Sequence, residues 1–162
     1  MKKIHPTQPA RIKNADTTPL RTVLYVEDES ENWEVTELRL RERFKLLWAR
    51  NDREACEIVR HQSNDLYAIL MDIQLKGATL DGIQLTRLFR GTLPSHQRPA
   101  YAAGIAAVDT PILFVTAYGN RYSEQELLEV GGSHFMTKPV DFVKLMLALA
   151  KFNLRKALQA GA

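Results

Sequence analysis

The feature that most restricts the fold of this chain is a set of short apolar runs, each ending in polar residues of distinct chemistry. Apolar runs of this length are typical of buried strands in a parallel sheet. Because the carboxyl ends of parallel strands lie along one edge, we expect the polar residues to meet there. The runs and the residues that follow them are Val23–Val26 before Glu27 and Asp28, Leu66–Met71 before Asp72, Ile112–Val115 before Thr116 and Ala117, and Phe135–Thr137 before Lys138 and Pro139.

Strand and helix signals alternate along the chain, which indicates crossover helices between parallel strands. Five such units predict a flavodoxin-like, doubly wound α/β fold whose parallel sheet has the order 2-1-3-4-5 and helices on both faces. The helix starts are indicated by a cap at Ser30, a start after Asp52, and capping boxes at Asp81 and Ser123. The predicted strands are Thr22–Glu27, Lys45–Ala49, Leu66–Asp72, Pro111–Thr116 and Ser133–Thr137.

Composition and charge indicate one domain with an appended basic segment. The chain has 162 residues and a net charge of +3, and its basic excess lies in the first twenty residues. We therefore interpret residues 1–20 as a flexible basic tail, 21–156 as the domain and 157–162 as a C-terminal tail, with no effector domain. Nucleic acid is not expected as a partner, because binding it needs basic residues clustered on the fold. The single cysteine, Cys56, and the lack of a membrane-spanning run predict a cytoplasmic protein with no membrane partner.

At the polar strand ends, the chain resembles the receiver domain of two-component response regulators, in the stand-alone form of the chemotaxis regulators. Glu27 and Asp28 match the acidic pair of that family, and Asp72 matches its phospho-accepting aspartate. The later matches are the hydroxyl residue and its small neighbour, the Lys-Pro pair and the switch aromatic, which correspond to Thr116, Ala117, Lys138, Pro139 and Phe135. The resemblance covers roughly residues 21 to 152.

The resemblance implies that Asp72 accepts a phosphoryl group from a histidine kinase or a histidine phosphotransfer protein. Mg²⁺, or Mn²⁺, suits such a site because it takes carboxylates and a phosphate oxygen as ligands. The implied ligands are Asp28, Asp72, the backbone carbonyl of Gln74 and, through a water, Glu27. Lys138 and the hydroxyl of Thr116 are expected to contact the phosphoryl oxygens.

The expected response to phosphorylation is a change of the surface formed by the fourth helix, the fifth strand and the fifth helix. Its switch residues are Thr116, Ala117 and Phe135, and Tyr118 and Tyr122 are expected to move with them. Because Phe135 has no hydroxyl that needs a partner, we expect it to be largely buried in the resting protein. We also expect the Lys138–Pro139 peptide bond to be cis, which only X–Pro bonds adopt readily.

Two segments depart from the pattern of the family. Asp72 and Gly82 are ten positions apart, which lengthens the loop Lys76–Leu80 beside the expected site. Residues Gly91–Thr110 form a long insertion between a helix and a strand, where we expect it to lie at the edge opposite the site. It is either a tolerated insertion or a contact for a partner or a second copy.

Two other classes of function remain open from the sequence. A phosphatase of the haloacid-dehalogenase type also forms an aspartyl phosphate, but it needs a second aspartate two positions after the nucleophile, and position 74 is Gln. A phosphate-independent interaction module could use the same fold. Failure to take up phosphate would favour that module over a receiver. A receiver is expected to be a signalling protein, not an enzyme that acts on separate substrates.

Overall fold

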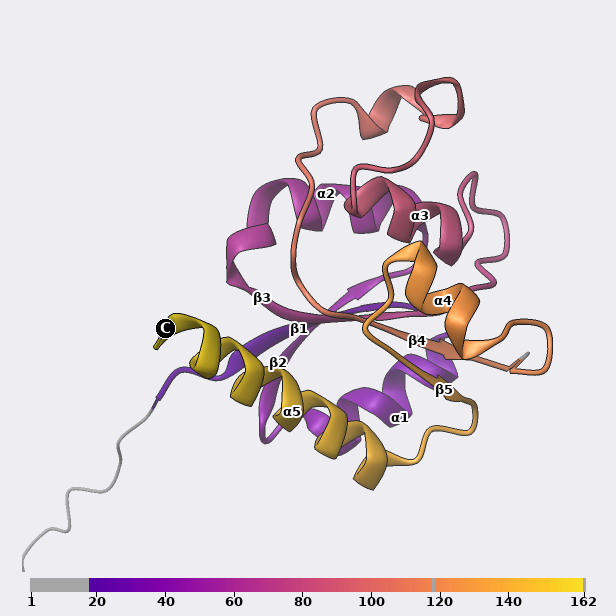
Figure 1. Ribbon diagram of the computed structural model, residues 1–162. Helices are drawn as coiled ribbons and strands as arrows, with labels where there is room; N and C mark the ends of the chain where they lie inside the picture. The colour runs from indigo at the N-terminus through magenta and orange to yellow at the C-terminus, as the bar shows by residue number, and fades with distance from the viewer. Residues whose placement is uncertain (1–17, 118, 162) are drawn as a thin grey trace, which may run out of the picture.

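A parallel five-stranded sheet with helices on both faces forms the body of the molecule (Figure 1). The computed structural model describes residues 18–117 and 119–161. All four strand pairs are parallel, and the strand order is β2-β1-β3-β4-β5. The predicted flavodoxin-like fold is therefore confirmed.

The ends of the strands differ from the predicted ones by at most one residue. The strands are β1 (Arg21–Val26), β2 (Phe44–Ala49), β3 (Leu66–Met71), β4 (Ile112–Thr116) and β5 (His134–Thr137). The α-helices are α1 (Ser30–Leu40), α2 (Asp52–Gln62), α3 (Gly82–Phe89), α4 (Glu124–Val130) and α5 (Phe142–Ala160). Three short 3₁₀ helices are η1 (Ser63–Asp65), η2 (Ser95–Gln97) and η3 (Ala100–Ala102). Glu27 and Asp72, which we predicted within strands, lie just past their ends.

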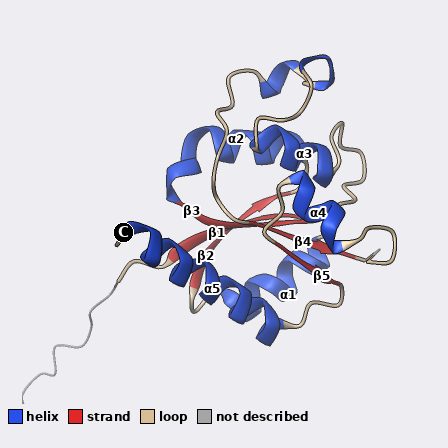
Figure 2. Cartoon of the chain, in the orientation of Figure 1, coloured by secondary structure: helices blue, strands red, loops and turns tan. Residues whose placement is uncertain are grey.

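Both faces of the sheet are buried, because successive side chains of a strand point to opposite sides. Leu24 and Phe114 belong to a core cluster completed by residues of α2, α3 and α4. Tyr25 and Val115 belong to the other cluster, completed by residues of α1 and α5. Figure 2 shows the strands between these two helical layers. None of the helices in the described part of the chain combines the length and the apolar character that a bilayer span requires.

The helix starts follow the local sequence closely. Both predicted capping boxes are present, with Asp81 and Ser123 as the capping residues. Two other starts are shifted by one residue. Ser30 is the first residue of α1 and not its cap, and Asn51 caps α2 by accepting a hydrogen bond from the backbone of Glu54.

The ends of the domain differ from the predicted division. Helix α5 continues to Ala160, so the predicted C-terminal tail at residues 157–162 is helical over its first four positions. The apolar spacing that predicted the helix continues on the buried face to Phe152, whereas Leu154 and Leu158 lie on another face and are exposed. The predicted basic tail lies, up to residue 17, outside the described residues.

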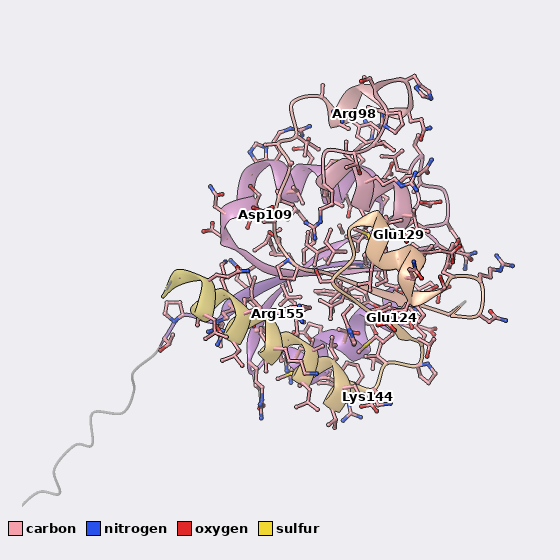
Figure 3. The ribbon with its side chains drawn as sticks, viewed as in Figure 1. Arg98, Asp109, Glu124, Glu129, Lys144 and Arg155 are labelled. Atoms are coloured by element: carbon pink, nitrogen blue, oxygen red, sulfur yellow. The ribbon has the colours of Figure 1, made fainter. Side chains whose placement is uncertain are left out.

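The insertion at residues 91–110, which we call the strap, is packed against α2 and α3. Leu93 and Ala102 are buried, and Ile105 and Val108 pack on the core cluster beneath α2 and α3. Arg90 holds the last residues of the strap, because its guanidinium donates to the carbonyls of Val108 at 2.6 Å and of Thr110 at 2.9 Å. Figure 3 shows Arg98 on the outer part of the strap and Asp109 on its return towards β4.

We predicted that the strap lies at the edge of the sheet opposite the site. This prediction is wrong for the middle of the strap. The hydroxyl of Tyr101 donates to the carboxylate of Asp52, the first residue of α2. Because α2 follows β2 directly, its first turn lies at the carboxyl edge of the sheet, where the acidic residues are. The strap therefore leaves the opposite edge and reaches the edge that carries the site.

Gly82 brings the start of α3 against the backbone just past the end of β3. A Cβ at this position would lie 2.0 Å from the backbone oxygen of Asp72, which cannot move aside as a flexible side chain could. We expect Gly82→Ala to lower the free energy of unfolding by about 1–3 kcal/mol, the usual cost of overpacking. Denaturant unfolding measures this. Gly161→Ala is the matched control, because its Cβ would meet only the carbonyl of Ala157 at 3.6 Å. Equal stability of the two variants would contradict the packing argument.

Candidate functional site

Three carboxylates meet at the carboxyl edge of the sheet. Glu27 and Asp28 follow β1 and Asp72 follows β3, the neighbouring strand. One oxygen from each side chain lies within 4.8 Å of the others. Glu27 is fully buried and Asp72 is 6% exposed, whereas Asp28 is partly exposed. Their adjacency in the folded chain follows from the pairing of β1 with β3.

Lys138 joins two of these carboxylates with its ammonium group. Its Nζ donates to Glu27 Oε2 at 2.6 Å and to Asp72 Oδ2 at 2.8 Å. The backbone N–H of Lys138 donates to the carbonyl of Thr116 at 2.8 Å, which holds the lysine beside the end of β4. The Lys138–Pro139 peptide bond is cis, as the sequence predicted.

Two aromatic residues hold Glu27 in place, and the sequence analysis missed both. The hydroxyl of Tyr25 donates to Glu27 Oε2 at 2.8 Å, and Trp48 Nε1 donates to the Glu27 carbonyl at 2.7 Å. Tyr25 could have been found, because residues two apart on a strand share a face and Tyr25 lies two positions before Glu27. Trp48 comes from the neighbouring strand β2, so only the strand order places it there.

The charges of the site are shifted by burial and by each other. Burial raises the pKa of Asp72 to about 6, with the Glu27 charge adding to the rise and Lys138 opposing it. For Lys138, burial opposes the charge, but the hydrogen bonds to Asp72 and Glu27 outweigh it and raise the pKa. Burial and the neighbouring Glu27 also raise the pKa of Tyr25, so its hydroxyl remains a proton donor.

The donor set fits a hard divalent cation. Three carboxylates face one ammonium, which leaves negative charge uncompensated among these four side chains. Mg²⁺ prefers oxygen ligands and is commonly held by one or two carboxylates. The amide of Gln74 donates to Asp72 Oδ1 at 3.2 Å, which places the backbone of Gln74 beside the cluster. The residues that we predicted as ligands are thus brought together.

The predicted switch residues lie on the last two strands of the sheet, at the end of β4 and in β5. Thr116 is fully buried at the end of β4, and Ala117 after it is exposed. Phe135 is partly buried and packs against the core cluster of α4, which agrees only partly with the expectation that it is largely buried. A Cβ on Gly119 would lie 3.3 Å from the Phe135 ring, so the ring borders the segment between β4 and α4. Tyr118 lies outside the described residues.

The family of the chain follows from its sequence as well as from this geometry. Residues 23–150 match the family described as the response regulator receiver domain. The chain belongs to that family. It is thus a receiver domain of two-component phosphorelay signalling, which is not a classical enzyme family, as the resemblance implied.

Similar curated proteins are mostly larger regulators that contain such a domain. The chain is 29% identical over 130 residues to the transcriptional regulatory protein ZraR of Klebsiella oxytoca, covering 80% of this chain and 25% of that protein. It is 32% identical over 121 residues to the phosphate regulon transcriptional regulatory protein PhoB of Pseudomonas aeruginosa, covering 74% and 45%. The chain therefore spans less than half of the length of each of these two relatives.

Two solved structures of receiver domains have a similar fold. One is the receiver domain of the sensor histidine kinase PA1611 from Pseudomonas aeruginosa, with magnesium coordinated in its active site cleft. It has 25% identity, a TM-score of 0.64 and coverage of 83% of this chain and 98% of that one. The other is the Saccharomyces cerevisiae complex of the histidine phosphotransfer protein Ypd1 with the receiver domain of Ssk1. It has 26% identity, a TM-score of 0.65 and coverage of 86% and 92%.

The raised pKa of Asp72 predicts that this carboxylate destabilises the metal-free fold at neutral pH. The unfolded chain ionises Asp near pH 3.9, so stability falls as the pH rises from there through about 6. We expect Asp72→Asn to raise the free energy of unfolding by about 2–3 kcal/mol at pH 7.5, at roughly 1.4 kcal/mol per pKa unit. The gain should shrink towards pH 4.

Denaturant unfolding in the presence of a chelator measures this difference. The control is Asp81→Asn, because Asp81 is exposed and Asn also caps helices well. An Asp72→Asn gain that is the same at pH 4 and pH 7.5 would contradict the assignment of the effect to ionisation.

Proposed function

We propose that Asp72 accepts a phosphoryl group from the phosphohistidine of a histidine kinase or histidine phosphotransfer protein, with Mg²⁺ or Mn²⁺ bound at Asp28 and Asp72. One observation carries the proposal: Lys138 bonds both Asp72 and the buried Glu27, so an ammonium is held where phosphoryl oxygens arrive. The cation lowers the repulsion between the carboxylates and the incoming phosphoryl group.

In the proposed transfer, an oxygen of Asp72 attacks the phosphorus of phosphohistidine. The bond from that oxygen to phosphorus forms, the nitrogen–phosphorus bond breaks, and its electron pair leaves with the imidazole of the donor, so no other reactant is needed. Lys138 and Thr116 then contact the phosphoryl oxygens. Exposed Ala117 carries no bulky side chain, which leaves room for the group.

The proposed output is a change of the surface formed by α4, β5 and α5, which starts from repacking at the ends of β4 and β5. Thr116 moves towards the phosphoryl group, and Phe135 turns into the space behind it. Partly buried Phe135 already packs on the core, so the switch needs only a bias between two arrangements. Tyr122, which also packs on this core cluster, is expected to move with it.

Further features of the proposal concern partners and location. The similar proteins include a hybrid signal transduction histidine kinase of Dictyostelium discoideum and the receiver domain that was solved in complex with Ypd1. This similarity supports a phosphohistidine as the phosphodonor. The reaction takes place in the cytoplasm, where kinases have access to ATP. Signalling proceeds by protein–protein contact, with no nucleic acid or membrane as partner.

Labelling by a small phosphodonor tests the site. We expect phosphoramidate with Mg²⁺ to label the wild-type chain and Asp81→Asn, and to leave Asp72→Asn unlabelled, because Asp72 supplies the attacking oxygen. Intact-mass measurement gives the stoichiometry. Label on Asp72→Asn at the wild-type level would refute the assignment. Steady turnover of a small phosphate ester by the wild-type chain would favour the phosphatase instead.

Asp28 and Glu27 should differ in their effect on Mg²⁺ binding. Both oxygens of Glu27 already accept hydrogen bonds, from Glu29, Tyr25 and Lys138, whereas Asp28 is partly exposed and accepts one at 3.2 Å from the backbone of Lys76. We expect Glu27→Gln to weaken Mg²⁺ binding about tenfold, as outer-shell changes do, and Asp28→Asn to weaken it several times more. Calorimetric titration measures both affinities, and equal losses would overturn the division of roles.

A further inference from the structure

The lengthened loop after β3, residues 73–81, is held by three carboxylates. Each accepts a hydrogen bond from one backbone N–H of the loop: Gln74 donates to Asp72 at 3.2 Å, Lys76 to Asp28 at 3.2 Å, and Leu80 to Asp52 at 2.9 Å. Leu80 itself is 2% exposed, so its end of the loop is buried. The loop that carries the proposed carbonyl ligand Gln74 is thus fixed at its beginning, its middle and its end.

These three attachments differ in their relation to the proposed metal. Asp72 and Asp28 are proposed metal ligands, so their oxygens are shared between the loop and the cation. Asp52 lies outside the acidic cluster and is 3% exposed at the start of α2. Its hold on Leu80 is therefore the one of the three that does not compete with metal binding.

Asp52 is held in turn by the strap. The Asp52 oxygen that accepts from Leu80, Oδ2, also accepts from the hydroxyl of Tyr101. An open cleft of about 470 Å³ is lined by both Tyr101 and Asp28, which places the strap beside the acidic cluster. The insertion is thus linked to the metal-binding loop through this carboxylate, and the Tyr101 hydroxyl also hydrogen-bonds the side chain of Thr79 in the loop.

Tyr101 is itself fixed from two sides. The guanidinium of Arg60, in α2, donates to the backbone carbonyl of Tyr101. The guanidinium of Arg53 lies over the Tyr101 ring, 4.4 Å from its centroid. Both arginines belong to the helix that carries Asp52. The Tyr101 ring therefore cannot turn away from the carboxylate without leaving Arg53, and its backbone cannot shift without losing Arg60.

We propose that Tyr101 and Asp52 are positioning residues for the metal site, and that the strap pre-organises residues 73–81 for cation binding. This inference rests on the proposed function, since it concerns the same site. A loop that is ordered before binding does not have to be ordered by the cation, and affinity rises accordingly. The strap thus acts on phosphorylation from outside the site, without contacting the phosphoryl group.

Removal of one hydroxyl tests this. Tyr101→Phe keeps the ring under Arg53 and removes only the hydroxyl, which donates to Asp52 and also hydrogen-bonds the side chain of Thr79 in the loop. We expect Mg²⁺ affinity to fall about three- to tenfold, the range of a single hydrogen bond. The rate of labelling by phosphoramidate at saturating Mg²⁺ should stay within about twofold of the wild type, because the chemical groups are untouched.

Mg²⁺ affinity can be followed by tryptophan fluorescence, because stacked Trp33 and Trp48 lie next to the site and Trp48 bonds the Glu27 carbonyl. The matched control is Tyr67→Phe, which also removes a hydroxyl donor, to the carbonyl of Leu149 in α5. Tyr67 packs with the opposite core cluster. The control should leave Mg²⁺ affinity unchanged even if it lowers stability, whereas a merely structural role of Tyr101 would move both variants alike.

Variants of Asp52 give a second, independent result. Asp52→Asn keeps an acceptor oxygen for Leu80 and should retain more Mg²⁺ affinity than Asp52→Ala, which removes both acceptors. Hydrogen exchange of the Leu80 amide reports on the attachment without any metal, and Tyr101→Phe should lower its protection. Unchanged Leu80 protection, or Mg²⁺ affinity equal to that of the wild type, overturns the role of the strap. A wild-type chain that takes no label overturns the proposed function instead, and the Leu80 measurement still decides the inference.

Discussion

The bonds from the ammonium of Lys138 to Glu27 and Asp72 are the interactions on which the site depends. A fully buried carboxylate is costly unless it is paired and hydrogen-bonded, and Glu27 meets that condition through Lys138, Tyr25 and the backbone N–H of Glu29. The three charged groups come from the ends of β1, β3 and β5. Their contact therefore requires the complete sheet, with β4 setting the distance between β3 and β5.

The ammonium of Lys138 compensates only part of the negative charge of the site, and the remaining charge favours a bound cation. A single ammonium leaves negative charge among the acidic side chains, and burial raises the pKa of Asp72 to about 6. Perturbed carboxyl groups of this kind are typical of functional sites, because a fold optimised for stability alone would avoid them. A bound divalent cation would supply the charge that these side chains lack. The same feature that weakens the metal-free fold thus favours the ligand.

The strap shows how an insertion can become part of a fold. Arg90 and Arg60 hold it through backbone carbonyls, which any sequence provides, so these contacts place only its path. Tyr101 is different, because its hydroxyl selects one buried carboxylate at the other edge of the sheet. A loop of this length is uncommon in a compact domain unless it has a functional role. The contact with Asp52 indicates a role in positioning the neighbouring site.

The strands, the strand order, the capping boxes and the residues of the acidic edge could all be predicted from the amino-acid sequence. These depend on short-range patterns: apolar runs such as Leu66–Met71 form buried strands, and Ser123 with Glu126 starts a helix wherever it lies. The resemblance to a family then named the roles of Asp72 and Lys138. The contact of Trp48 with Glu27, and that of Tyr101 with Asp52, 49 positions earlier in the chain, became visible in the folded structure alone. Such contacts have no local periodicity, because they depend on how separate helices and loops pack in space.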